Sequence, residues 1–116
     1  MLAINAEDWN GGVTVSLNGR ADFEAVQPLR EGLQKVALKR PEVAIIDLSQ
    51  LDFIGSGGIG VLVEFRKAIV KNGGRVVIAA ANEYVAHCFH LSRLDTTFEM
   101  RSSIAEAKGE SPVRKK

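Results

Sequence analysis

The fold of this chain is decided by residues 47–60, which read DLSQLDFIGSGGIG. Four apolar residues, 43–46, precede this stretch, and the small residues 55–58 lead into a second apolar segment. An uninterrupted apolar run is typical of a parallel strand buried on both faces, since such a strand does not alternate. The stretch therefore predicts a central strand near Val43 to Leu48, a short loop and the start of a helix.

Ser56 is the one hydroxyl at this junction, and it is predicted to be the N-cap of the helix. Its oxygen would accept a hydrogen bond from a free backbone N–H of the first turn, which is a common role for serine. Gly57 and Gly58 let other groups approach this backbone closely. Residue chemistry alone favours a simple cap. Exposed amides at a helix start also attract anions, so they would hold a phosphate on Ser56.

The segments on either side of this centre complete a predicted sheet. Residues 2–6 and 13–17 alternate between apolar and polar side chains around a glycine-rich turn. This pattern predicts an antiparallel hairpin, with the Trp9 ring partly buried over its end. Residues 75–79 are predicted to form a second buried parallel strand, which a helical crossover joins to 43–46. Together these strands indicate an α/β fold.

Helices are predicted to follow Gln27, Ser56 and Asn82. The first begins near Pro28, because the residue before a proline is biased away from helical angles and proline is tolerated in a first turn. Pro41 ends this helix.

The later helices have recognisable ends. The helix after Ser56 is predicted to run to about Asn72, where two glycines stop it. Ser103 and Glu106 form a capping box for a last short helix. The helix capped by Asn82 is predicted to bury Val85, Cys88, Phe89 and Leu91.

Length and charge limit the classes of function. A chain of 116 residues is predicted to fold as one domain. Fifteen Lys and Arg against fourteen Asp and Glu leave a net charge of +1, which offers no field to recruit nucleic acid or an acidic membrane. The apolar runs are shorter than the roughly 20 residues that a membrane span needs. We therefore expect a soluble cytoplasmic protein with a protein partner, no nucleic acid and no membrane insertion.

Metal and enzyme chemistry are both disfavoured. His87 and His90 are close on a helix, but no third ligand follows at a useful spacing and Cys88 points away from both. As the only cysteine, Cys88 excludes an internal disulfide. The glycine-rich stretch lacks the lysine of a phosphate-binding loop and does not match a dinucleotide site in register. No metal, cofactor or catalytic residue is predicted.

The residues around Ser56 resemble the STAS domain, the family of bacterial anti-sigma factor antagonists and of the cytoplasmic domains of sulfate transporters. Gly55 stands where many antagonists carry Asp, and Gly57 stands where Ser, Thr or Ala is common. The matching residues are Asp47-Leu48-Ser49, Phe53-Ile54, Ser56 and Gly58-Ile59.

Two further segments are similar to the family. Residues 19–22, Gly-Arg-Ala-Asp, resemble a Gly-x-hydrophobic-Asp loop that lies beside the phosphorylation site in STAS proteins. Asp22 is accordingly open to two interpretations, a turn cap or a residue facing Ser56 and a partner. Residues 85–98 resemble the family's last helix, turn and strand, which implies a short strand near Phe98.

The resemblance implies a single STAS-like domain over 1–108. It has a mixed four- to five-stranded sheet with an N-terminal antiparallel hairpin, parallel central strands and helices packed mainly on one face. Residues 109–116 have nothing to bury and are predicted to be a mobile tail.

The resemblance also implies a function, that of an anti-sigma factor antagonist. In the family the residue matching Ser56 is phosphorylated by a partner kinase. The implied partners are an anti-sigma factor serine/threonine kinase of the histidine-kinase-like ATPase type, bound in the unphosphorylated form, and a PP2C-like phosphatase. The alternative is a stand-alone STAS subunit bound to the ATPase of an ABC-type lipid transporter. The predicted partner-binding residues are Asp22, Gly55, Ser56, Gly57, Gly58 and Ile59.

Overall fold

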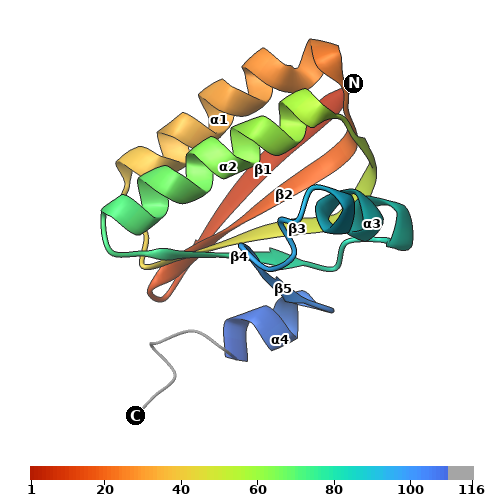
Figure 1. Cartoon of the computed structure of the whole chain (residues 1–116). Helices are drawn as coiled ribbons and strands as arrows, with labels where there is room; N and C mark the ends of the chain where they lie inside the picture. The colour runs from red at the N-terminus through yellow and green to blue at the C-terminus, as the bar shows by residue number, and fades with distance from the viewer. Residues whose placement is uncertain (110–116) are drawn as a thin grey trace.

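A five-stranded mixed sheet of order β1-β2-β3-β4-β5 is the centre of the fold (Figure 1). The computed structural model describes residues 1–109. The first two strands are antiparallel, and each later strand is parallel to its neighbour. The predicted hairpin, parallel centre and α/β fold class are confirmed. The strands are β1 (Leu2–Trp9), β2 (Gly12–Ala21), β3 (Val43–Ile54), β4 (Arg75–Ala79) and β5 (Glu99–Arg101).

β3 extends past its predicted end at Leu48 to Ile54. Two register shifts against β2 each place one extra residue on β3, as β-bulges do. Asp47 supports the first irregularity, because its Oδ1 accepts the Ser49 N–H at 2.9 Å. The polar residues after Leu48 are therefore strand, and Gly55 alone separates β3 from the next helix.

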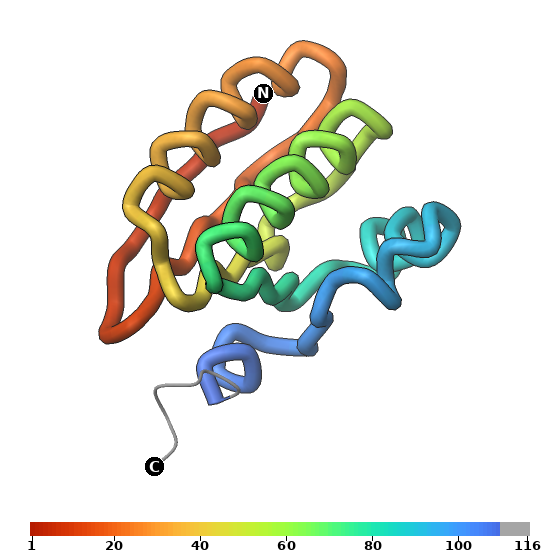
Figure 2. The backbone as a smooth tube through the Cα atoms, turned by 60° about the vertical axis from the view of Figure 1, so that its left-hand side comes forward, coloured from red at the N-terminus to blue at the C-terminus, as the bar shows by residue number. Residues whose placement is uncertain are grey.

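Besides one 3₁₀ turn, residues 1–109 form four α-helices, of which three cover one face of the sheet and the fourth covers part of the other. Figure 2 shows the first two lying side by side along the sheet, with the last one apart from them. The helices are a 3₁₀ turn η1 (Phe23–Ala25), α1 (Val26–Leu38), α2 (Ser56–Lys71), α3 (Glu83–Leu91) and α4 (Ile104–Gly109).

Burial follows this layering. The main core joins one sheet face to α1, α2 and α3 through side chains that include Leu17, Leu33, Ile46, Leu62 and Phe89. A smaller cluster joins the opposite face to α4 and consists of Val43, Ile45, Val77, Ala79 and Ala107. Helices packed mainly on one face were predicted, and the second cluster shows why the other face needs a short helix as well.

Two details of the predicted helices are wrong. The first helix begins at Val26 and not near Pro28, since Pro28 is its third residue, where the missing N–H would have had no helical partner anyway. Leu91 is 69% exposed and not buried, because it lies about 200° around the helix from the buried Phe89. Cys88 is half-buried.

The predicted caps of the last two helices are present. Asn82 Oδ1 accepts the Val85 N–H at 2.8 Å. Ser103 Oγ accepts the Glu106 N–H at 3.1 Å, and Glu106 Oε1 in return accepts the Ser102 N–H at 3.0 Å. These bonds satisfy backbone groups that the helix itself leaves free.

Trp9 covers the end of the hairpin as predicted. Its ring is half-buried, donates to Thr14 Oγ1 at 3.0 Å and packs under the Lys108 ammonium. Apart from Gly109, the predicted mobile tail lies outside the described residues. None of the helices within residues 1–109 is long and apolar enough to cross a membrane.

Candidate functional site

Ser56 lies where β3 passes into α2, at the carboxyl ends of two neighbouring parallel strands. The Gly55 N–H donates to the Ala21 carbonyl at 2.9 Å, which fixes the junction against the end of β2. Ser56 itself is exposed. A single hydroxyl is therefore presented to solvent on a rigid strand-to-helix junction.

The predicted N-cap role of Ser56 is wrong by one residue. Gly55, with extended backbone angles, is the N-cap, and its carbonyl accepts the Ile59 N–H at 3.0 Å. Ser56 is the first residue inside the helix, where a side chain points away from the free amides that a cap serves. Within residues 1–109 no hydrogen bond of the Ser56 hydroxyl is found. The hydroxyl is thus accessible to a modifying enzyme from solvent.

The glycines at this junction differ in what they permit. A Cβ on Gly57 would lie 2.8 Å from Val26 Cγ2, so this glycine lets α1 approach the start of α2. Gly58 is buried, and a Cβ there would lie 3.3 Å from the Ala21 Cβ. A Cβ on Gly55 would meet nothing closer than 3.6 Å, so a side chain would fit there.

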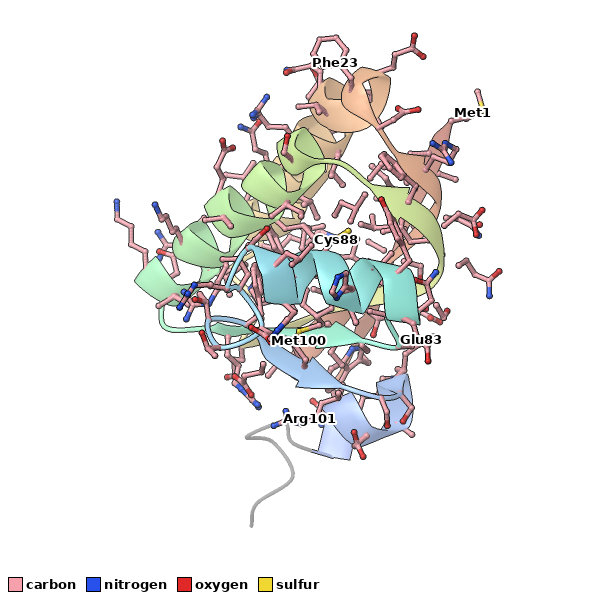
Figure 3. The ribbon with its side chains drawn as sticks, turned by 45° about the vertical axis from the view of Figure 1, so that its right-hand side comes forward. Met1, Phe23, Glu83, Cys88, Met100 and Arg101 are labelled. Carbon is pink, nitrogen blue, oxygen red and sulfur yellow. The ribbon has the colours of Figure 1, made fainter. Side chains whose placement is uncertain are left out.

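An open groove of about 400 Å³ runs beside the hydroxyl, between the start of α2 and the end of α3. Its floor is apolar, and Ser56 lies on its rim next to the exposed Leu91. Cys88 lies on the side of α3 that is turned toward α2 (Figure 3). The groove is lined by Ile54, Ser56, Ile59, Gly60, Cys88, Leu91 and Ser92.

A stack of side chains flanks the same junction. The Arg20 guanidinium lies 4.5 Å from the centre of the Phe53 ring, and that ring stacks on Tyr84 with centroids 6.0 Å apart. The pKa of the Tyr84 phenol is raised, mainly by its hydrogen bond with Cys88 and to a lesser extent by partial loss of hydration. This stack connects the ends of β2 and β3 to the start of α3.

Asp22 begins η1 on the other side of Ser56. It is half-buried, and its backbone carbonyl accepts the Ala25 N–H at 3.0 Å. Its carboxylate makes no cap bond to the 3₁₀ turn. The Asp22 side chain therefore does not act as the cap of this turn.

All the predicted partner-binding residues come together at this one end of the sheet. Ser56 and Gly57 are exposed and Ile59 is half-exposed, whereas Gly58 acts by close packing. Sequence reasoning did not single out Phe23 or the exposure of Leu91. The available sequence signal for Phe23 was its position between two acidic residues, in Asp22-Phe23-Glu24.

The histidines of α3 do not form a metal centre in the part of the chain that the structure describes. The His87 and His90 rings stack with centroids 6.4 Å apart, and His90 Nδ1 pairs with the Asp95 carboxylate at 2.8 Å. Residues 1–109 contain no group of three or more His, Cys, Asp and Glu placed to hold a metal.

The order of the strands and the placement of the helices define the class, a small α/β domain with a mixed sheet and an antiparallel first hairpin. The chain belongs to the STAS domain family, whose model matches residues 3–107.

Its relatives within the family include anti-sigma factor antagonists. The anti-sigma-F factor antagonist RsfB of Mycobacterium tuberculosis is 29% identical over 109 residues, which cover 91% of this chain and 86% of that protein. A crystal structure of an anti-sigma factor antagonist from Mycobacterium paratuberculosis superposes with a TM-score of 0.89 at 26% identity, covering 96% of this chain and 94% of that one. Antagonists of this kind are binding proteins rather than enzymes.

The antagonist SpoIIAA shares the fold. Its unphosphorylated form gives a TM-score of 0.81 at 23% identity, with 97% of this chain and 96% of that chain covered. The phosphorylated form from Bacillus gives 0.72 at 21% identity, with 91% and 96% covered.

Proposed function

We propose that this protein is an anti-sigma factor antagonist that is switched by phosphorylation of Ser56. In its unmodified form it binds an anti-sigma factor serine/threonine kinase of the histidine-kinase-like ATPase type, and the sigma factor is released. The observation that carries the proposal is the exposed Ser56 hydroxyl, free of hydrogen bonds within residues 1–109 and placed on the rim of an apolar groove. A kinase can reach such a hydroxyl without unfolding any part of the domain.

A phosphate would change the site through charge and hydration. It adds about −1.5 to −2 charges and three strongly hydrated oxygens at the start of α2. The positive end of the α2 dipole stabilises that charge, so the modified domain stays folded. Beside Ile59 and Leu91, however, the phosphate resists the loss of water that docking requires. The modified form therefore releases the kinase.

The remaining roles follow from this arrangement. Asp22, Gly55, Gly57 and Ile59 surround the hydroxyl on the docking surface, while Gly58 keeps α2 close to β2. A PP2C-like phosphatase resets the switch. The reaction takes place in the cytoplasm, the antagonist itself catalyses nothing, and the kinase supplies the chemistry.

Binding measurements with three variants test the switch. Wild type, Ser56→Ala, Ser56→Asp and Ser56→Glu are titrated against the candidate kinases of this type from the source organism. We expect the alanine variant to bind like wild type and the acidic variants to bind more weakly, because only they place a charge on the groove rim. Ser49→Asp is the matched control, since Ser49 is also exposed but lies in β3.

Mass spectrometry of wild type after incubation with kinase and ATP identifies the modified residue. Phosphate at Ser56 supports the proposal. Phosphate only at Ser49, Ser102 or Ser103, or equal binding by the alanine and acidic variants, would contradict it. In that case an unphosphorylated subunit of a lipid transporter would be the better account.

A further inference from the structure

We propose that Phe23 is a second anchor for the kinase: its ring enters an apolar pocket on the partner, and Asp22 and Glu24 pair with basic side chains around that pocket. This inference rests on the proposed function, since it assigns a further contact to the same docking event. It adds a specific apolar contact on the side of Ser56 opposite the groove.

The Phe23 ring is held out in solvent. It is 91% exposed, a higher fraction than any other large apolar side chain of residues 2–109. Figure 3 shows it projecting from η1 away from the body of the molecule. A phenyl ring kept in water is unfavourable, and rigid aromatic side chains are frequent anchors of interfaces because little conformational freedom is lost when they bind. The short 3₁₀ turn, closed by the Ala25 N–H to the Asp22 carbonyl, fixes the backbone that carries the ring.

Phe23 is also close to the proposed switch. The turn η1 packs against α2. Val26, three residues after Phe23, contacts Gly57, and Ala21, two residues before it, binds the Gly55 N–H. The η1 turn and the groove thus flank Ser56 on two sides, and a partner that covers the hydroxyl meets both.

Charge determines the kind of surface that fits around the ring. Asp22 and Glu24 stand on either side of Phe23, and no ion pair to either carboxylate is found among residues 1–109. Both of these residues line a surface depression of about 310 Å³. A second copy of the chain would bring the same two carboxylates together, which is unfavourable, and nucleic acid or an anionic membrane would be repelled. The occupant is therefore a protein surface with an apolar pocket and a basic rim.

The test compares matched variants in titrations with the kinase. Phe23→Ala is compared with Leu38→Ala, since Leu38 is an 82% exposed apolar residue at the far end of α1. Loss of a central apolar anchor is expected to raise Kd by about 30-fold or more, whereas the Leu38 variant stays within about twofold of wild type.

A second pair of variants tests the charges. Asp22→Asn/Glu24→Gln is compared with Glu7→Gln/Glu42→Gln, which removes the same number of charges from exposed positions elsewhere. Removing the flanking carboxylates should weaken binding at low salt and flatten the dependence of Kd on salt, because the attraction to basic side chains is screened by ions. The control pair should keep the wild-type salt dependence. Circular dichroism and thermal unfolding confirm that all variants are folded.

The two proposals fail in different ways. If wild type binds the kinase and Ser56→Asp weakens binding, but Phe23→Ala binds like Leu38→Ala, the anchor is refuted and the switch stands. If wild type binds none of the kinases, the proposed function fails first. An unchanged salt dependence in Asp22→Asn/Glu24→Gln would refute the basic rim.

Discussion

The surroundings of Gly55 indicate which other residues this position can accept. Its backbone is extended, with φ −94° and ψ 175°, and the space around it accepts a Cβ. Neither conformation nor packing requires a glycine. The residue is nevertheless the N-cap of α2, a position at which a carboxylate bonds to the free amides of the first turn.

We therefore expect Gly55→Asp to stabilise the domain by a few tenths of a kcal/mol up to about 1 kcal/mol. Urea unfolding at neutral pH measures the change. Gly57→Ala is the matched control, because its Cβ would lie 2.8 Å from Val26 and should lower the stability. A destabilised Gly55→Asp would show that the junction has no room for a side chain after all.

At the scale of single elements, α2 ends in a Schellman motif, as the pair Gly73-Gly74 in the sequence indicates. The Gly73 N–H donates to the Val70 carbonyl at 2.9 Å, and the Gly74 N–H donates to the Ile69 carbonyl at 2.9 Å. Gly73 has φ +89°, a conformation that L-residues adopt only with strain. Gly60, in the first half of the same helix, has helical geometry and open space around it.

Alanine at these two glycines should therefore act in opposite directions. Gly73→Ala is expected to cost about 1 kcal/mol, since the strain of a positive φ appears in the folded state. Gly60→Ala is expected to add about 0.5 to 1 kcal/mol, because alanine loses less conformational freedom in a helix. Chemical denaturation of both variants checks the prediction, and shifts of the same sign would contradict it.

Helices α1 and α2 are joined on their outer side by the Arg30–Glu64 ion pair, in which the Arg30 Nε lies 3.1 Å from Glu64 Oε1. The hydrogen bond from Arg30 lowers the pKa of the Glu64 carboxyl. A depressed pKa in the folded state gives stability that is present above the unfolded-state value, 4.5, and lost as the pH falls below it. Both side chains are exposed to water, so the contribution is small.

Glu64→Gln should be slightly less stable than wild type at neutral pH. This difference should vanish as the pH is lowered from about 5 to about 3, where the wild-type carboxylate is protonated as well. Thermal midpoints of both proteins over this range measure it. A difference that grows with acid would mean that the ion pair does not lower the Glu64 pKa.

The whole molecule depends on the core between the sheet and three helices. Ile46 in β3 and Leu62 in α2 are both fully buried there. Ile46→Ala and Leu62→Ala should each cost about 2 to 4 kcal/mol, since each leaves a cavity that the packed neighbours cannot fill. Leu38→Ala, at an exposed site, should stay within about 0.5 kcal/mol of wild type in the same urea titration. Unchanged midpoints in both core variants would mean that the core lies elsewhere.

Sequence patterns predicted the central parts of this molecule better than its junctions. The run at 43–46 indicated a strand because burial on both faces leaves a strong apolar signal. The polar continuation of β3 could not be predicted, since bulges and the Asp47–Ser49 hydrogen bond extend it without any apolar pattern. For the same reason the cap was predicted at Ser56, one residue too late, because the loop before the helix appeared longer than the single Gly55.

The candidate site was predicted in part. The stretch from Gly55 to Ile59 carried both the turn chemistry and the resemblance to the STAS family, and the structure brings these residues together with Asp22. The groove was not predictable, because it depends on how α3 packs and on which side Leu91 faces. Phe23 was missed because a sequence does not show that an apolar side chain remains in water.

The start of the chain lies unusually close to the surface on which the partner would dock. The Met1 carbonyl accepts the Arg20 N–H at 3.1 Å, and Met1 lines the same depression as Asp22 and Glu24. Figure 3 shows Met1 near Phe23, with α4 at the opposite end of the molecule. An affinity tag or two-hybrid bait fused in front of Met1 would therefore sit over the η1 turn and obscure an interaction that the domain itself can make. α4 lies away from this surface, so capture experiments should carry the fusion on the C-terminal side of the domain.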